Sequence, residues 1–499
     1  MKVGDIVEGV LDIEPNGSGY LILDNSDRYY IYKKNVYKGF DGDRVQAILI
    51  DGKAKDTLEA RVVRIVSRKR YTYIGTVIDK TKNNGFLSVD SKRISQDFYL
   101  KKKDIVKYSL GDKLKVRIES WEDDKSPVCQ VLGKIGEVGE NSAEIESILF
   151  EYDLNPNFPK EVEEQSESID WNIPESEIKK RKDYRNVNTI TIDPLTAKDY
   201  DDAISLRKKG KNYEIGIHIA DVTHYIQPDT ALDKEAFKRG TSVYLVDRVI
   251  PMLPERLSNG VCSLRPNEDK LTFSVILEVN KNGDVLSSWI GRTIINSDYR
   301  YTYEEAQHMI EGGDDIGGFK EDILILDGIS KKIRSKRKSV MFNRKEVKFV
   351  LDHDYKPIDV SVDESGQDSH QLIEELMLLA NQAVGKKLFE TGIGIYRNHD
   401  TPNADKLIEL KNIASNCGFS LDLSDVRIGL NNLARDVKDT EFEEMLQTLS
   451  VRAMSKAEYG ADNIGHYGLN FDFYSHFTSP IRRYSDVIAH RLISKIFNI

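Results

Sequence analysis

Short runs in which apolar and polar residues alternate fill residues 1–135, with turn residues between them. Two clear examples are Arg44-Val45-Gln46-Ala47-Ile48 and Lys113-Leu114-Lys115-Val116-Arg117, and each directly follows a Gly-Asp pair. A period of two residues is typical of a strand with one buried face. The pattern therefore predicts an all-β region at the start of the chain.

The same order of motifs occurs twice in this region, at a spacing of roughly 66 to 69 residues. Each copy has a glycine followed by an aromatic residue, then an aromatic run, then a Gly-Asp pair. The two copies are Gly19-Tyr20, residues 29–32 and Gly42-Asp43, and Gly85-Phe86, residues 98–100 and Gly111-Asp112. We predict two small β-barrels in tandem, at residues 1–68 and 69–135.

The pattern changes after residue 135. Residues 136–185 read as a connector, because a helical pattern at the start of this stretch is interrupted by Pro156 and Pro159. From residue 186 to residue 499, helical and strand patterns mix without a visible repeat, which predicts one large α+β domain. Its clearest helices are predicted over residues 370–390 and 484–497.

Four aspartates lie close together at the start of this domain. The run VNTITID (residues 187–193) alternates like a strand and ends with Asp193, and Asp199, Asp201 and Asp202 follow before an apolar run resumes. Four carboxylates in a confined site cannot all stay ionised without a compensating cation. Oxygen ligands without a nearby histidine or cysteine favour Mg²⁺ or Mn²⁺ over zinc. From these residues alone, a solvated turn and an incidental calcium site are alternatives.

Four longer segments carry a resemblance to a known family. In chain order they are TIDPLTAKDYDDA (191–203), HIADV (218–222), SVYLVDRVIPMLPERLSNGVCSL (242–264) and HFTSPIRRYSDVIAHR (476–491). Together they resemble the RNB catalytic domain of the ribonuclease II and ribonuclease R family, and they look closer to bacterial ribonuclease R. The barrels are similar to the cold-shock type of OB fold. The resemblance implies a multidomain protein in which two cold-shock-type OB β-barrels precede a large α+β RNB domain.

The resemblance also implies a role for each acidic residue. Asp193 and Asp202 would be the principal metal ligands, and Asp199 would help to hold the metal. Asp201 would complete the metal site and orient or activate the attacking water, so we expect the rate to depend on it most. The implied cofactor is Mg²⁺, with Mn²⁺ as the other candidate.

Four further residues would contact RNA. Arg482 would contact the phosphate that is cleaved, since a guanidinium offers paired donors to phosphate oxygens; the alternative is a structural pair with Asp486. Tyr244 and Phe342 would stack on bases, and Glu374 would accept a hydrogen bond from the ribose 2′-OH, the group that distinguishes RNA from DNA. Without the resemblance, both aromatic residues would be interpreted as core residues.

The implied activity is that of a 3′-to-5′ exoribonuclease, which hydrolyses single-stranded RNA ends to nucleoside 5′-monophosphates. Family members normally continue past the last RNB helix into another OB-type barrel, and we expect this chain to lack that barrel because it ends at Ile499. The frontal barrels would contact RNA or serve as structural covers. A non-catalytic RNA-binding regulatory protein with a degenerate RNB domain is an alternative. Another is a carboxylate-metal phosphoesterase that acts on a small phosphate ester or on DNA.

Composition sets the remaining expectations. The net charge is −10, but basic runs at residues 101–103, 179–185 and 331–338 are compatible with a cationic track or with solvated faces. Three widely spaced cysteines argue against a disulfide framework and suit a reducing cytoplasm. No apolar stretch is long enough for a membrane span. We expect a cytoplasmic monomer that binds single-stranded RNA 3′ ends, and the sequence identifies no RNA-decay or ribosome-associated partner.

Overall fold

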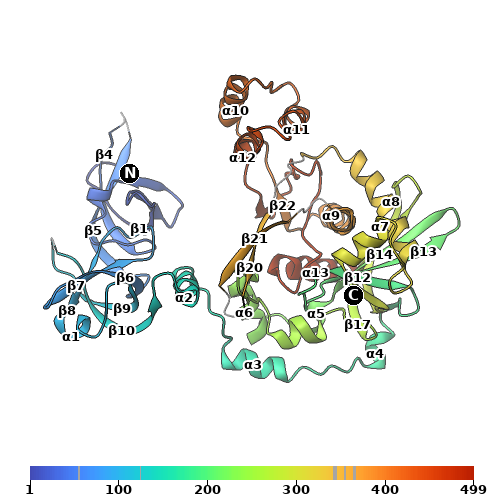
Figure 1. Ribbon diagram of the computed structural model, residues 1–499, viewed down its shortest axis with the longest axis horizontal. Helices are drawn as coiled ribbons and strands as arrows, with labels where there is room; N and C mark the ends of the chain where they lie inside the picture. Colours follow the sequence, from blue (N-terminus) through green and yellow to red (C-terminus); the bar gives the residue numbers. More distant parts are fainter. Residues whose placement is uncertain (54–56, 124, 341–345, 353–355, 364–366, 499) are drawn as a thin grey trace. The chain divides into compact units, whose positions relative to one another are not determined.

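Figure 1 shows the computed structural model of the chain, which describes all residues except 54–56, 124, 341–345, 353–355, 364–366 and 499. The chain forms two compact units, Met1–Pro156 and Asn157–Ile499. In the part of the chain that is described, no helix combines the length and the apolar character that crossing a membrane requires.

The first unit begins with a closed barrel of five strands in the order β1-β2-β3-β5-β4. The strands are β1 (Ile6–Ile13), β2 (Gly19–Leu23), β3 (Arg28–Ile31), β4 (Arg44–Asp51) and β5 (Leu58–Ser67). In β4 every second side chain points inward, and Val45, Ala47 and Leu49 are fully buried. The alternation predicted at residues 44–48 is confirmed.

A second closed barrel follows, in the order β10-β8-β7-β6-β9. Its strands are β6 (Thr72–Lys80), β7 (Asn84–Val89), β8 (Phe98–Lys101), β9 (Asp112–Ser120) and β10 (Val128–Glu137). Phe40 of the first barrel packs into the core of the second and stacks on Trp121, with ring centroids 5.0 Å apart. The prediction of two tandem barrels is confirmed, and the two barrels share part of their core.

The boundary between the two units falls inside the predicted connector. The helical pattern predicted there corresponds to α2 (Asn141–Glu151), which packs against the second barrel and buries Ala143, Ile145 and Leu149. Three further elements begin the second unit: α3 (Lys160–Glu167), α4 (Glu175–Ile178) and the short strand β11 (Lys182–Asp183).

A seven-stranded sheet in the order β11-β18-β17-β14-β13-β12-β19 forms the centre of the second unit. Its other strands are β12 (Thr189–Asp193), β13 (Asp202–Lys209), β14 (Asn212–Ala220), β17 (Asp269–Val279), β18 (Val285–Asn296) and β19 (Tyr299–Thr302). β12 is buried along its whole length and β17 along nearly all of it. Both faces of these strands are buried, so that polar residues such as Thr191 and Ser274 lie in the interior as well.

Helices cover this sheet and share its core. They include α7 (Tyr303–Ile310), α8 (Lys320–Lys336), α9 (Asp368–Glu390) and α13 (Tyr484–Phe497). Leu376 and Ala380 of α9 pack in one cluster with Ile217 and Phe273 of the sheet. The helices predicted over residues 370–390 and 484–497 are therefore confirmed as α9 and α13.

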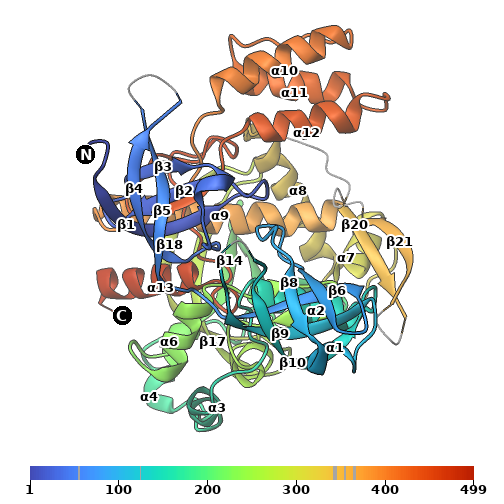
Figure 2. The same cartoon turned by 90° about the vertical axis from the view of Figure 1, so that its left-hand side faces the viewer.

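Three helices form a separate module between β22 (Tyr396–Asn398) and β23 (Glu458–Gly460). They are α10 (Ala404–Asn416), α11 (Val426–Asp436) and α12 (Glu443–Ala453), and they lie side by side in both views (Figures 1 and 2) around a core of their own. The remaining helical segments are Lys33–Asn35, α1 (Lys102–Ile105), α5 (Val222–Tyr225), α6 (Ala231–Arg239) and Arg256–Val261. Two hairpins complete the described elements: β15 (Val243–Tyr244) with β16 (Val249–Ile250), and β20 (Glu346–Leu351) with β21 (Pro357–Asp363).

Candidate active site

Two of the predicted aspartates lie at neighbouring strand ends. β12 ends with Asp193 and β13 begins with Asp202, and the two strands are antiparallel neighbours. The loop of residues 194–201 therefore leaves and re-enters the sheet at the same end. Because this loop carries Asp199 and Asp201, chain connectivity brings all four carboxylates into one region.

A buried serine holds this acidic loop. Ser263 Oγ donates a hydrogen bond to the carbonyl oxygen of Lys198 (2.8 Å) and accepts one from Tyr200 N (3.0 Å). The Ser263 side chain is inaccessible to solvent. The amide of Leu264 also donates to the carbonyl oxygen of Tyr200, at 3.0 Å. These bonds fix the backbone on both sides of Asp199, and sequence analysis did not single out Ser263.

Burial makes ionisation of the four carboxyl groups unfavourable. Asp193 and Asp201 are only 8% and 6% exposed. Burial raises the pKa of Asp201 to about 7. The pKa of Asp202 is raised well above its ordinary value by burial and by the adjacent carboxylates of Asp193 and Asp201. Burial likewise raises the pKa of Asp193 and of Asp199. A bound cation would relieve this mutual repulsion.

The donor set fits a divalent cation in its chemistry. Asp193 Oδ2 is buried and has no hydrogen-bond partner among the described residues, and carboxylate oxygens are the ligands that Mg²⁺ prefers. However, within the described part of the chain no three Asp, Glu, His or Cys side chains are arranged so as to hold a metal ion. The candidate ligands therefore share one region, but this conformation does not form a closed set of ligands.

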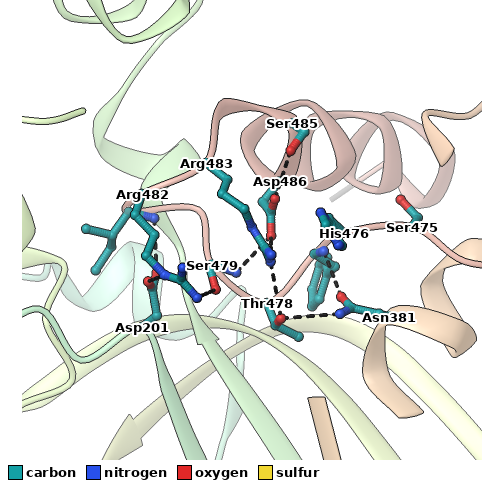
Figure 3. A network of polar contacts seen from close by, with 12 residues as sticks. Asp201, Asn381, Ser475, His476, Thr478, Ser479, Arg482, Arg483, Ser485 and Asp486 are labelled. Carbon is teal, nitrogen blue, oxygen red and sulfur yellow. Dashed lines mark hydrogen bonds and ion pairs between the residues drawn. The ribbon is translucent and has the colours of Figure 1, made fainter. Parts of the chain in front are cut away.

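A turn at residues 478–483 brings Arg482 to the acidic group (Figure 3). The amide of Ile481 donates to Asp201 Oδ1 (3.0 Å), and Arg482 Nε lies 3.5 Å from Asp201 Oδ2. Arg482 Nη2 also donates to Ser479 Oγ (2.9 Å). Its side chain is 42% exposed. This position leaves the guanidinium accessible to a phosphate while it borders the buried carboxylates.

The described structure pairs Asp486 with Arg483 and not with Arg482. Asp486 Oδ1 accepts a hydrogen bond from Arg483 Nη2 (2.7 Å) and another from Ser479 N (2.8 Å). Although burial opposes ionisation of Asp486, the Arg483 guanidinium holds the pKa of its carboxyl below the usual range. The ion pair with Asp486 that was the alternative role for Arg482 is therefore formed by Arg483. This contact of Arg483 fixes the turn that carries Arg482.

Tyr244 lies beside the same turn. Tyr244 belongs to β15. The chain just before this strand is anchored to the turn, because Ser242 N donates a hydrogen bond to the carbonyl oxygen of Arg482 (3.0 Å). The Tyr244 side chain is 56% exposed, while partial burial and the Asp199 carboxylate raise the pKa of its hydroxyl. An exposed ring near the carboxylates is available for stacking. Phe342, the other predicted stacking residue, lies outside the described residues.

The helix α9 carries Glu374 on a face that also contacts the site. His370, Glu374 and Asn381 share one helix face because they are spaced by whole turns. Asn381 Oδ1 accepts a hydrogen bond from Phe477 N (2.8 Å), within the segment that leads to Arg482. Glu374 itself is exposed.

The adjacent Glu375 points elsewhere. It is 1% exposed and forms an ion pair with Arg337, whose side chain is also buried. Burial raises the pKa of Glu375, while Arg337 opposes that increase. Of the two neighbouring glutamates, Glu374 is therefore the accessible one.

Tyr303 is a further residue of the site that sequence analysis did not single out. Its ring stacks on His370 with centroids 3.9 Å apart and planes within 10°. Burial and the Asp202 carboxylate raise the pKa of the Tyr303 hydroxyl, so the ring lies near the acidic group. The sequence did contain a signal: Thr302 and Glu305 form a capping box, which marks the helix start at Tyr303.

Comparison with known proteins agrees with this architecture. The family model of the RNB domain matches residues 181–498, and that of the cold shock domain matches residues 86–159. Ribonuclease R 1 of Lactococcus lactis subsp. lactis is 34% identical over 98% of this chain and 63% of its own length. Ribonuclease R of Thermotoga maritima is 35% identical over 99% of this chain and 71% of its own length. The chain thus spans less than two thirds of the first relative.

Solved structures show the same fold. Mycoplasma genitalium ribonuclease R in complex with ribose methylated single-stranded RNA is 25% identical, with a TM-score of 0.88 over 98% of this chain and 79% of that chain. Yeast Ssd1, described as a pseudonuclease, is 17% identical, with a TM-score of 0.74 over 99% of this chain and 69% of that chain; this likeness concerns the fold alone. Since the RNB model covers well over half of the sequence, the chain belongs to the RNB-domain family and is of the ribonuclease R type.

Proposed function

We propose that the chain is a metal-dependent 3′-to-5′ exoribonuclease that hydrolyses single-stranded RNA ends to nucleoside 5′-monophosphates. The observation that carries the proposal is the group of buried carboxylates that borders the accessible guanidinium of Arg482, 3.5 Å from Asp201. The relatives named ribonuclease R support the same class of activity.

Asp193, Asp199, Asp201 and Asp202 are the residues that would hold Mg²⁺ or Mn²⁺. A divalent ion at this position supplies an activated water and neutralises charge on the phosphate oxygens. Asp201 is suited to orient that water and accept a proton near neutral pH, because burial raises its pKa to about 7. The amide of Ile481, at 3.0 Å from Asp201 Oδ1, keeps the carboxylate in one orientation.

Arg482 would stabilise the phosphate during cleavage. Its guanidinium is already restrained by Ser479 Oγ and by Asp201, so little orientational freedom is lost when a phosphate binds. Paired N–H donors match the oxygens of a phosphate and stabilise the charge that develops in the transition state.

The remaining proposed contacts position the RNA strand. Stacking on Tyr244 and Phe342 would be worth about 1–3 kcal/mol per base and would tolerate any sequence. Glu374 would accept a hydrogen bond from a ribose 2′-OH and so favour RNA over DNA. The cold-shock-type barrels would add contacts to the strand. The structure of the Mycoplasma genitalium protein with single-stranded RNA supports this substrate class. We also propose that the protein acts as a cytoplasmic monomer.

The decisive experiment is a time course on a 5′-labelled RNA duplex with a single-stranded 3′ tail. With Mg²⁺ we expect a ladder that shortens from the 3′ end and releases nucleoside 5′-monophosphates, and with excess EDTA we expect no product. Asp201→Asn should bind RNA almost as the wild type does but turn over at least about 100-fold more slowly. Asp405→Asn, an exposed control, should behave as the wild type. Internal cleavage, or a fast Asp201→Asn variant, would contradict the proposal.

A non-catalytic RNA-binding protein is the second candidate. It is favoured by the lack of a three-ligand arrangement among the described residues. The presence of all four aspartates argues for catalysis. This candidate predicts that RNA binds but that no nucleotide is released at any Mg²⁺ or Mn²⁺ concentration, so the same time course separates the two functions.

A further inference from the structure

A cavity of about 490 Å³ lies at the β11–β18 edge of the sheet. Five cationic side chains reach it from three parts of the chain, with a single acidic residue among them: Lys180, Lys182, Arg292, Lys386, Lys387 and Glu390. On a chain whose net charge is −10, this is a local reversal of charge. A cavity of this volume is in the range that holds small ligands.

The positive charge of the cavity is only partly neutralised by the protein. Lys387 lies 3.3 Å from Glu390 and Lys180 lies 3.6 Å from Glu177. Arg292 Nε lies 3.5 Å from the buried Asp221 Oδ2, so three of the five cations have an acidic partner. By contrast, Lys182 and Lys386 have no ion pair within the described part of the chain. Two lysines therefore face the cavity with their charges available to a ligand.

Lys182 is held in position mainly by aromatic rings, and the nearby Glu214 carboxylate interacts with its charge without forming an ion pair among the described residues. Lys182 Nζ lies 4.7 Å from the centroid of the Trp289 ring. Trp289 in turn packs closely against Gly291, where a Cβ atom would come within 2.5 Å of the indole. This cation–π contact restrains the ammonium group without cancelling its charge.

The basic run at residues 331–338 differs from this group. In the run at residues 331–338, Lys331 contacts both Asp327 and Asp368, Lys336 contacts Asp284, and Arg337 contacts Glu375. Acidic partners therefore contact three of the six basic side chains in that run. The run at residues 179–185 differs because two of its lysines meet a second basic pair, Lys386-Lys387, at one cavity.

We propose that this cavity binds the phosphate groups of nucleotides or of a single-stranded nucleic acid. The site is distinct from the acidic group: His370 and Lys386 lie on the same helix, α9, at a separation of about 24 Å for a rise of about 1.5 Å per residue. A phosphate bound by Lys182 and Lys386 is therefore not the phosphate that meets Arg482. The inference goes beyond the proposed function and does not depend on hydrolysis.

Binding of two probes tests the proposal. The first probe is adenosine 5′-monophosphate, and the second is an oligothymidylate, which presents phosphodiesters. Lys182→Glu combined with Lys386→Glu should weaken binding of one or both probes at least about tenfold. Lys238→Glu combined with Lys411→Glu changes the net charge equally at exposed positions outside the cavity. This control should leave both dissociation constants within about twofold of the wild type.

The pattern of changes identifies the source of the phosphate. Weaker binding of adenosine 5′-monophosphate assigns the cavity to free nucleotides. An effect confined to the oligomer, with a dependence of affinity on salt that is shallower by about 0.7 for each phosphate no longer bound, assigns it to the strand. The single variant Lys386→Gln changes one exposed side chain and should not affect folding, so weaker binding by this variant reflects the loss of the charge. Equal binding by the cavity variants and the control variants would overturn the proposal, even if the protein hydrolyses RNA.

Discussion

The hydroxyl of Ser263 bonds the backbone on both sides of Asp199, through Lys198 O at 2.8 Å and Tyr200 N at 3.0 Å. Removing it leaves two partly buried backbone groups without this partner, so the loop should shift. We predict that Ser263→Ala lowers kcat about 10- to 100-fold, because small displacements of catalytic groups have large effects. It should also raise the Mg²⁺ concentration needed for half-maximal activity and leave the KM for RNA unchanged. Steady-state kinetics across a Mg²⁺ titration measure all three.

Ser450→Ala is a matched control for this variant. Ser450 is 2% exposed, and its hydroxyl donates to the carbonyl oxygen of Leu446 (2.7 Å) in the helical module. Both variants lose a buried hydrogen bond, so the free energy of unfolding should fall by about 1 kcal/mol in each. Only Ser263→Ala should change the Mg²⁺ dependence. If the two variants have the same kinetics, Ser263 does not position the loop.

The aspartates of the site could be predicted from the sequence, whereas the residues that position or flank them, Ser263 and Tyr303, could not. Asp193 and Asp202 stand out because charged residues directly adjoin buried strands, and long motifs surround them. Ser263 lies inside the motif of residues 242–264, and a capping box marks the helix start at Tyr303, but neither signal points to the acidic group. A serine or a tyrosine fits a buried or half-buried position without any periodic pattern. Their importance comes from partners that lie 65 and about 100 residues away in sequence. Pairing of distant residues is fixed by packing, which a single sequence does not display.

Among the elements of the second unit, β11 is anchored by a fully buried ion pair. Arg181 Nη2 lies 2.8 Å from Asp221 Oδ2, and neither side chain is exposed. We predict that Arg181→Met lowers the free energy of unfolding by about 3–5 kcal/mol, because it leaves the Asp221 carboxylate buried without its main partner. Urea unfolding monitored by tryptophan fluorescence measures the change. Arg185→Met, at a partly exposed pair with Asp183, should cost less than about 1 kcal/mol.

The same ion pair gives the sign of a pH effect. Burial opposes ionisation of Asp221, but Arg181 and Arg292 hold the pKa of its carboxyl well below the usual range. A depressed carboxyl pKa stabilises the fold above the unfolded value of about 3.9, and this stability is lost as the pH falls through the folded value. The difference in stability between the wild type and Arg181→Met should therefore shrink in acid. A difference that grows in acid would contradict the assignment.

Elements with a local pattern were predictable, and their arrangement was not. The alternation in β4 and β9 and the helical period of α9 are local, so the sequence places these elements closely. The order of the strands in the seven-stranded sheet could not be predicted in this way. β12 lies between β13, which follows it in the chain, and the distant β19. Such parallel pairing between remote segments leaves no periodic trace in the sequence. The module of α10, α11 and α12 was also absent from the prediction, although its helices share one core.

At the level of the complete chain, each compact unit has hydrophobic cores of its own. The barrels are built around clusters that include Leu21 and Phe98, whereas the second unit is built around clusters that include Ile217 and Leu257. Units with separate cores can fold alone. The change in pattern after residue 135 predicted a division between barrels and catalytic domain, but α2 packs on the barrel side, so the division between units falls after Pro156.

This division leads to a prediction for a fragment of residues 157–499. It contains the four aspartates, Arg482 and Tyr244, so it should hydrolyse a short RNA oligonucleotide with nearly the kcat of the full chain. For a long RNA, its KM should rise at least about tenfold, which corresponds to the absence of stacking on one or two bases. The salt dependence of affinity should also become shallower, by about 0.7 for each phosphate that the barrels no longer bind. Kinetics on both substrates at several salt concentrations measure these changes.

The comparison of the two substrates decides what the barrels do. If they contact RNA, removing them should affect only long substrates, because a short strand does not reach beyond the second unit. If they are structural covers, the fragment should instead lose kcat and stability on every substrate, with an unchanged salt dependence for the binding that remains. Tyr20 and Tyr30 in the first barrel, and Phe86 and Tyr99 in the second, are only partly buried, which leaves ring surface for bases. We therefore expect the first result, and a fragment equal to the full chain on long RNA would exclude a role for the barrels in substrate binding.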